Sequence, residues 1–316
     1  MVVVSSATLS KEGRSFAASR SIVAGRFALF LDGVFAGWLQ SVEGGNATAD
    51  VVKEALGPSL FNKKHLGSLK YEDITIQLGL SMTSSIYDWI TASWSRNYTR
   101  KNGSIIGCDF EGNALWVREF FDALITETTI PAADAASKDP GYMTLKLAPE
   151  FTRFTKADGQ KISGDLGKGQ QTVWLPSNFR LEIDGLDCTR ANKVESITIK
   201  QTLVTNDTGE ERDHTREPGE VEFPNLKITI SEVGSESWWD YFEDFVIGGN
   251  NAEANEKSGA LVFLSPSLQE EILRIGFLNI GVFRMTPDKF VANEDKIRHL
   301  SFELYCERME FIYPAN

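Results

Sequence analysis

The chain has 316 residues, of which 42% are hydrophobic and 24% are charged, and its formal net charge at pH 7 is −12. This is a globular composition, with enough chain for one large domain or for two domains of about 150 residues each. The acidic balance argues against a nucleic-acid-binding surface, which is normally basic, and no apolar run is long enough to span a membrane. Three scattered cysteines give no disulfide framework and favour assembly in a reducing cytoplasm.

The first predicted domain extends over residues 25–156, after an N-terminal arm, residues 1–24. Its first strand lies in the segment "RFALFLDG", where side chains alternate between two faces before an Asp-Gly turn. A second strand, a long polar connection (Glu43–Lys70) and the alternating strand "YEDITIQL" follow.

An amphipathic helix is predicted next, in "TSSIYDWITASWSR", because Ile86, Trp89, Ile90 and Trp94 share one face. Further strands are expected around Ser104–Asp109, Ala114–Phe121, Tyr142–Ala148 and Phe151–Lys156. This order predicts a mainly β domain, a small barrel or sandwich with one packed helix. The polar, glycine-rich residues 157–176 are interpreted as a linker to a second domain, residues 177–316.

The second predicted domain repeats the first. A shift of 152 residues pairs "NFRLEIDG" with "RFALFLDG" and the strand "FPNLKITI" with "YEDITIQL". It also pairs the second helix, in "SESWWDYFEDFVIGG", with the first, and the connection Glu195–Glu222 with Glu43–Lys70. Towards the C-terminus the shift grows to 156 and then 157, as a loop insertion would cause. Several blocks in one order predict a tandem duplication.

No constellation for catalysis or for a cofactor is present in the sequence. His65, His214 and His299 are not at ligand spacing from one another or from a cysteine, and there is no nucleophile elbow. The segment "SGDLGKGQ" resembles a phosphate loop but lacks its first glycine and its Ser/Thr. Asp32-Gly33 and Asp184-Gly185 are better read as turns than as calcium ligands. The chain is therefore predicted not to be an enzyme, with no metal and no cofactor.

The blocks resemble, in series, the tail tube proteins of contractile-tailed bacteriophages and of contractile injection systems. The first half has the F-x-x-x-x-D-G strand, then "KYEDITIQLG", the helix tryptophan, and "RKNGSI" before "WVREFFDA". The core and turn positions of the motif are Phe27, Asp32, Gly33, Tyr71, Trp89, Phe179, Asp184, Gly185, Phe223 and Tyr241. Two departures are the second domain and Leu78, which stands where a basic residue is common.

The resemblance implies a structural protein of the virion tail, assembled in the cytoplasm of a bacterial host. Six barrel domains would form a ring by joining sheet edges, and rings would stack into a tube, because an open strand edge is a template for another chain. The long connections are the candidates for ring stacking, with Glu43, Gly45, Lys53, Lys63, Lys64, Lys70, Glu195, Lys200, Glu211, Arg216 and Glu222. The implied partners are this chain itself, a tail sheath, and baseplate or terminator proteins.

Several alternatives remain open at this point. Three chains could build a ring with alternating halves, or six chains could build it with one half lining the channel. The channel could carry DNA, which would pass without specific binding along an acidic wall, or an effector. The chain could instead be a baseplate, hub or tube-initiating component in low copy, or a two-domain β-rich module for glycan binding and adhesion.

Overall fold

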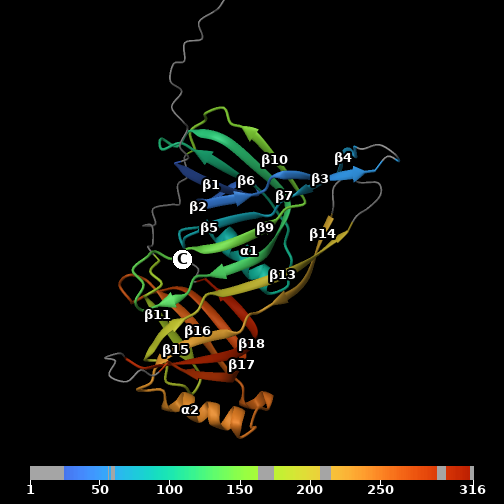
Figure 1. Cartoon of the computed structure of the whole chain (residues 1–316). Helices are drawn as coiled ribbons and strands as arrows, with labels where there is room; N and C mark the ends of the chain where they lie inside the picture. The colour runs from blue at the N-terminus through green and yellow to red at the C-terminus, as the bar shows by residue number, and fades with distance from the viewer. Residues whose placement is uncertain are drawn as a thin grey trace, which may run out of the picture.

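The computed structural model describes residues 25–55, 57, 61–162, 174–206, 215–289 and 297–313. The molecule is elongated and mainly β, with one barrel-like sheet at each end and the two sheets in contact near the middle (Figure 1). This confirms the predicted fold class, two tandem β domains with a helix in each. The predicted N-terminal arm and the central part of the predicted linker, residues 163–173, lie outside the described residues.

The first domain is a closed antiparallel barrel. Its strands follow each other around the barrel in the order β7-β6-β1-β2-β5-β9, and β9 pairs with β7 to complete the circle. The elements are β1 (Arg26–Leu31), β2 (Val34–Gly44), β3 (Ala47–Glu54), β4 (Lys63–Tyr71), β5 (Ile74–Leu78), α1 (Ser84–Trp94), β6 (Lys101–Cys108), β7 (Ala114–Ile130), β8 (Ala133–Asp134), β9 (Met143–Ala148) and β10 (Phe151–Lys156). Because the barrel is closed, the edge that it offers to a neighbour is the end of β7, residues 127–130, which pairs with β13.

Helix α1 packs against the barrel by the apolar face that its sequence predicts. Ile86, Trp89 and Ile90 are buried, and the indole Nε1 of Trp89 donates a hydrogen bond to the carbonyl oxygen of Thr99 over 2.7 Å. A buried indole needs such a partner, since an unpaired buried donor costs about 1–3 kcal/mol. The helix is thereby fixed to the chain that leads into β6.

The second domain is an open sheet with the strand order β11-β16-β17-β18-β15-β12-β8. Its elements are β11 (Phe179–Ile183), β12 (Ala191–Val194), β13 (Ile197–Asn206), β14 (Thr215–Glu222), β15 (Leu226–Ser231), α2 (Glu236–Phe242), the π-helical turn η1 (Glu243–Ile247), the 3₁₀ turn η2 (Glu253–Asn255), β16 (Lys257–Leu264), β17 (Glu271–Pro287) and β18 (His299–Ile312). Strand β8 belongs to the first half of the chain and forms the last strand of this sheet.

The strand pairing of the second domain repeats that of the first. The irregularity between β7 and β9 lies at Ile125/Glu127, and that between β17 and β18 at Val282/Arg284, 157 residues later. The left-handed residues in these strands, Asp122 (φ 48°) and Asn279 (φ 52°), are also 157 residues apart. Bulges are specific features of a strand pair, so their repetition supports the tandem duplication that the sequence predicts.

The two domains differ where their first strands end. In the first domain, β1 and β2 form a tight hairpin around the left-handed Asp32 and Gly33. In the second domain only the bridge between Ile183 and Leu186 forms, and the following residues leave β11. The backbone N–H of Asp187 donates to Ser237 Oγ and its carbonyl oxygen accepts from Trp238 Nε1. The start of α2 thus holds the segment that would otherwise close the second barrel.

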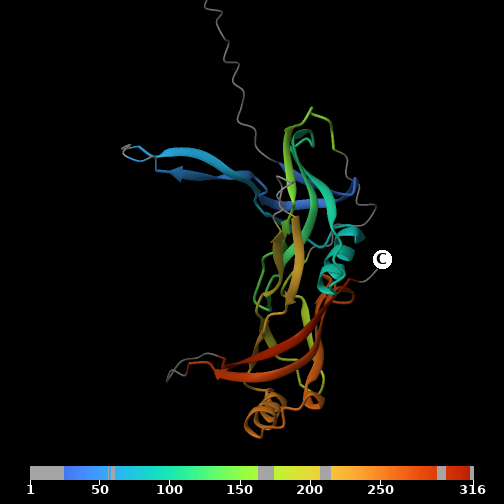
Figure 2. The same cartoon turned by 90° about the vertical axis from the view of Figure 1, so that its right-hand side faces the viewer.

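The two long polar connections are hairpins, not loops. Strands β3 and β4 pair from Ala47 opposite Tyr71 to Glu54 opposite Lys63, and β13 and β14 pair in the same way. The sequence predicts only a long polar connection at these places, because strands β3 and β4 are exposed on both faces and therefore show no clear period of two. Figure 2 shows the β3–β4 hairpin extending away from the body of the molecule.

Two equivalent glycines test this fold. A Cβ on Gly103 would press against the carbonyl oxygen of Phe30 and the ring of Phe120, and a Cβ on Gly259 against the carbonyl oxygen of Glu182. We expect Gly103→Ala and Gly259→Ala each to lower the free energy of unfolding by about 1–3 kcal/mol, the usual cost of overpacking. Urea unfolding measures this, with Gly79→Ala as the control, since a Cβ there meets nothing within 4 Å. Equal stability of all three variants would contradict the strand pairing.

Candidate assembly interface

The contact between the two domains is an exchange of strands. Strand β7 is 17 residues long, and its last residues reach beyond β6 to pair with β13 of the second domain, from Ile130 opposite Ile197 to Glu127 opposite Lys200. In return, β8 of the first half pairs with β12, with Ala133 opposite Val194. Each sheet is therefore extended by a strand from the other domain, which is the mode of contact expected between neighbouring barrels.

Arg216 on β14 is the central polar residue of this contact. Its guanidinium donates to Asp73 Oδ1 over 2.6 Å and to the carbonyl oxygen of Tyr71 over 2.9 Å. Its backbone N–H donates to Glu150 Oε1 over 2.9 Å, and its carbonyl oxygen accepts from Arg100. The side chain of Arg216 is only 19% exposed. Partial burial and charged partners put such hydrogen bonds at the strong end of the usual range, about 1.5–3 kcal/mol.

An aromatic cluster forms the apolar part of the contact. Tyr87 on α1 stacks on Tyr313 with ring centroids 3.8 Å apart and an interplanar angle of 15°. Trp94, two turns further along the same face of α1, meets Phe311 of β18 edge to face at 5.3 Å. Thr91 Oγ1 lies between them and donates to the carbonyl oxygen of Phe311 over 3.3 Å. Burial, followed by the neighbouring Tyr313, raises the pKa of Tyr87 far above its usual range, so its hydroxyl stays neutral.

The predicted stacking residues make different contacts in the structure. Only Arg216, of those in the described part of the chain, donates a side-chain hydrogen bond across the contact. Lys70 forms an ion pair with Asp50 inside its own hairpin, and Glu195 forms one with Lys193. The rest are Glu43 at the end of β2, Gly45 between β2 and β3, Lys53 on β3, Lys63 and Lys64 on β4, Lys200 on β13 and Glu222 on β14, while Glu211 lies outside the described residues. Their role in stacking stays a prediction.

The predicted core and turn residues lie where the motif needs them. Trp89, Tyr71 and Tyr241 are buried, and Phe27, Phe179 and Phe223 pack partly buried against the core. Gly33 and Gly185 have left-handed φ values of 82° and 73°, which glycine adopts without strain, after Asp32 and Asp184. Sequence reasoning missed the role of Tyr87, Trp94 and Phe311, because a buried aromatic at helix or strand spacing gives the same pattern whether it packs in a core or between domains.

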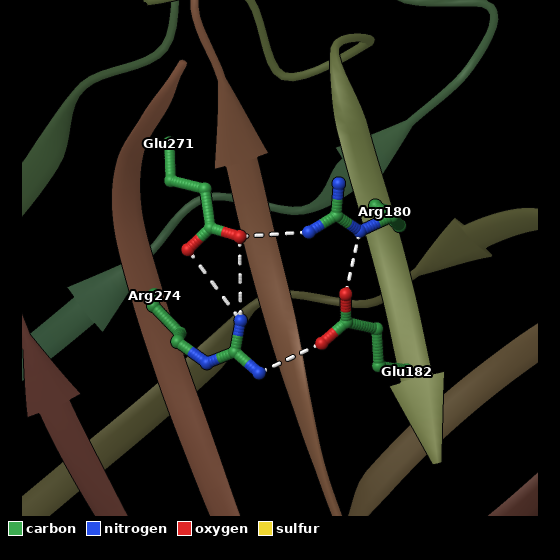
Figure 3. A network of polar contacts seen from close by, with 4 residues as sticks. All are labelled: Arg180, Glu182, Glu271 and Arg274. Carbon is green, nitrogen blue, oxygen red and sulfur yellow. Dashed lines mark hydrogen bonds and ion pairs between the residues drawn. The ribbon is translucent and has the colours of Figure 1, made fainter. Parts of the chain in front are cut away.

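The outer face of the second sheet carries a cyclic network of four charges (Figure 3). Arg180 contacts Glu182 Oε1 over 2.6 Å and Glu271 Oε1 over 2.7 Å, and Arg274 contacts Glu182 Oε2 over 2.7 Å. Burial alone would raise the pKa of Glu182, but the hydrogen bonds from Arg180 and Arg274 outweigh it and hold the pKa below its usual value. The network links β11 to β17 across β16 and has no net charge.

The described residues hold no arrangement that suggests chemistry. They contain no group of three or more His, Cys, Asp or Glu side chains that could bind a metal ion. Within the same residues, no helix has the length and apolarity to cross a bilayer. The three cysteines are free thiols, and burial raises the pKa of Cys188 and of Cys306 to about 11, so neither is a reactive thiolate at neutral pH.

Comparison with known proteins identifies the first domain. Residues 23–152 match the family model of the T4-like virus tail tube protein gp19, which covers less than half of the chain. These residues are therefore similar to the tail tube proteins of that family. No curated protein matches the sequence.

Solved structures resemble one half of the chain at low TM-scores. The tube-terminating cap of the anti-feeding prophage has a TM-score of 0.42 and 20% identity, over 47% of this chain and 100% of that chain. The sheath-tube complex of the extracellular contractile injection system PVC gives 0.40 and 20%, over 44% and 95%. Hcp1 from Flavobacterium johnsoniae gives 0.28 and 16%, over 44% and 99%. The assignment of the first domain depends on the family model and not on these likenesses.

The interdomain contact can be weakened at Arg216. We expect Arg216→Ala to cost about 1.5–3 kcal/mol, because Asp73 and the carbonyl oxygen of Tyr71 lose a charged donor. The loss should uncouple the domains, so that urea unfolding separates into two transitions. Arg153→Ala is the matched control, since Arg153 is 58% exposed and pairs with Glu119 at 3.5 Å, a contact worth about 0–1 kcal/mol. A single unshifted transition for Arg216→Ala would contradict the role of this residue.

The charge network predicts a pH dependence of stability. The pKa of Glu182 in the folded protein lies below its ordinary value of 4.5, so its stabilising contribution is complete above that value and is lost as the pH falls through the folded pKa. We expect Glu182→Gln to lower the free energy of unfolding at pH 7 by about 0.2–1 kcal/mol and to have a smaller effect near pH 3. Denaturant titrations at both pH values measure this, with Glu253→Gln on the exposed turn η2 as control. A difference that grows towards low pH would refute the sign.

Proposed function

We propose that this chain, whose residues 23–152 match the T4-like virus tail tube gp19 family, is a structural protein of the tube of a contractile tail or contractile injection system. The single observation that carries the proposal is that family match, and the repeated strand pairing extends it to residues 177–316. The chain then provides two consecutive tube barrels, residues 25–156 and 177–316. Its work is mechanical and needs no catalytic residue.

The contact between the domains supports this function physically. The end of β7 accepts β13 of the second domain, and β8 of the first half joins the sheet of the second domain, so each of the two sheets contains a strand from the other half. Main-chain hydrogen bonds give such a border strength and register without depending on many side chains. A wall built by strand addition resists the radial forces in a tube better than a wall of exposed ion pairs would, since each of those contributes only about 0–1 kcal/mol.

The partners in this proposal are further copies of the chain, a surrounding sheath, and baseplate or terminator proteins at the tube ends. The channel would carry DNA or an effector without specific binding. The net charge of −12 supports the DNA alternative, because a wall of like charge lets a phosphate backbone slide. We propose assembly in the cytoplasm of a bacterial host and incorporation into a tail or injection particle.

Electron microscopy of the purified protein tests the proposal. Long hollow tubes of uniform width at high protein concentration are the expected result. A monomer at every concentration, with affinity for glycans, would replace the proposal by an adhesion module. The number of copies in a purified particle distinguishes a tube protein, present in each ring along the tube, from a baseplate, hub or initiating component, present in one or two rings.

The tip of the β3–β4 hairpin is expected to act in ring stacking. Val52 and His65 are paired across the hairpin, so a two-residue Asn-Gly turn can replace residues 53–64 without changing the register. The replaced tip contains Lys53, Lys63, Lys64 and the 83%-exposed Phe61. We expect this variant to have an unchanged melting temperature and to form rings that no longer stack. Full-length tubes from the shortened protein would show that stacking depends on another surface.

A further inference from the structure

The repeat makes the contact within one chain a template for a contact between chains. The surfaces that form the contact have counterparts in the other domain, shifted by 152 residues before the helix and through it, and by 157 residues after β7 begins. In the contact between domains, the first domain uses α1 and the end of β7, and the second uses β13, β14 and the end of β18. Within the part of the chain that the structure describes, the counterparts of these surfaces pair with no strand or helix of the other domain.

The helices show the clearest difference between a covered surface and its uncovered counterpart. Tyr87 and Trp94, which pack on β18, are 2% and 4% exposed. Their counterparts in the second domain, Trp239 and Val246, are 43% and 38% exposed, and the neighbouring Ile247 is 71% exposed. Three large apolar side chains on one short helical segment are thus left open to solvent at the position that is covered in the first domain.

The strand end that should cover this helical segment is also exposed. Phe311 lies opposite Ile275 in the β17–β18 pair, and its counterpart Phe154 lies opposite Arg118 in the β7–β10 pair, so the two phenylalanines have the same register. Phe311 is 4% exposed, because α1 covers it, whereas Phe154 is 60% exposed. Strand β10, which contains Phe154, lies towards one end of the molecule and α2 at the other (Figure 1), so one chain cannot bring them together.

The strand edges show the same difference, since an edge that is paired in the contact has an unpaired counterpart in the other domain. The end of β7 that accepts β13 corresponds to residues 284–287 of β17, which among the described residues pair only with β18. The first pairing residues of β13, 197–200, correspond to residues 45–48, where β3 begins and pairs only with β4 within the described chain. Neither edge has a further strand partner among the described residues, although Thr152 Oγ1 donates to the carbonyl oxygen of Gly45. Figure 2 shows the β3–β4 hairpin and the end of β17 extending from the same side of the molecule.

The charges at the corresponding positions are complementary. Arg216, whose backbone N–H donates to the Glu150 carboxylate, corresponds to Lys64, and Glu150 corresponds to Glu307. Tyr313 and Thr91 correspond to Lys156 and Glu243, which would place a cation beside a carboxylate and near the ring of Trp239. Opposite charges at both pairs of positions favour this docking and disfavour a shifted one.

We propose that the second domain of one copy binds the first domain of a second copy, in a joint that repeats the interdomain contact of the chain. Trp239, Val246 and Ile247 cover Phe154 of the second copy, and β3 of the second copy pairs with residues 284–287 of β17. The two kinds of barrel then alternate. On the proposed tube function, with six barrels in a ring, the ring closes with three chains, not six.

Charge substitutions test the joint. Phe154→Asp is expected to leave the protein monomeric with an unchanged melting temperature, because a carboxylate replaces the apolar residue at the centre of the joint. Phe110→Asp is the matched control, since Phe110 is also exposed, at 72%, but lies in the turn between β6 and β7, outside the joint. Light scattering should give about 105 kDa, three chains of 35.1 kDa, for the assembled wild type and for the control. Assembly of Phe154→Asp equal to the control would overturn the proposal.

Thiol cross-linking identifies the joint directly. In the double variant Phe154→Cys/Val246→Cys, a short bis-maleimide should link neighbouring chains into dimers and closed trimers, whereas Phe110→Cys/Val246→Cys should stay monomeric on a denaturing gel. Cross-linking without tubes in the microscope would refute the tube function and keep the joint. Tubes without cross-linking would refute the joint and keep the function. A cross-linked ladder continuing beyond trimers would refute the three-chain ring.

Discussion

The structure depends on one constraint, that the central strand of each barrel is longer than the barrel can pair. Strand β7 pairs with β6 up to Ala123, and residues 127–130 extend beyond that edge. Unpaired N–H and C=O groups in a buried position cost about 1–3 kcal/mol each. The strand must therefore receive a partner from elsewhere, and in this chain it receives β13. The first sheet closes into a barrel and the second stays open, while one hydrophobic core extends through both domains. The protruding strand end makes each domain dependent on a neighbour.

Much of this fold could be predicted from the sequence because the relevant signals are local. Alternation in "RFALFLDG" and "NFRLEIDG", the helical spacing of Ile86, Trp89 and Ile90, and the shift between the halves all follow from short-range periodicity. The hairpins were missed for the opposite reason. Strands β3 and β4 have few buried residues on either face, so no alternation marks them, and only backbone pairing between two distant segments defines them.

The interface could not be predicted in the same way, because its residues have two possible environments that look the same in a sequence. Trp94 and Phe311 have the pattern of core residues, and the structure buries them between domains. Arg216 was included among charged stacking candidates for its position in a long connection, but nothing in the sequence distinguishes it from Lys200 or Glu222 nearby. The distinction comes from Asp73 and Glu150, which lie 143 and 66 residues away from Arg216 and meet it only in the folded chain.

Joining two barrels in one chain makes the two joints of a ring unequal. The joint inside the chain forms at a high effective concentration whatever the protein concentration, and it has Arg216, whose planar guanidinium reaches two acceptors at once. The proposed joint between chains has Lys64 at that position, a single point charge, and exchanges Tyr87 and Trp94 for Trp239 and Val246. A weaker joint between chains lets a wrongly placed copy dissociate before the ring closes.

Because the two halves of the chain differ in sequence, the outer surfaces of the two domains also differ. Where the second sheet has the network of Arg180, Glu182, Glu271 and Arg274, the corresponding residues of the first are Ala28, Phe30, Ala114 and Val117. Ala28 and Ala114 are buried, so a ring of alternating halves would show the charged network on every second domain only, repeated with threefold symmetry. A protein that binds the side of such a ring would then find three equivalent sites instead of six. A ring built from six identical single domains has six equivalent sites and cannot present three.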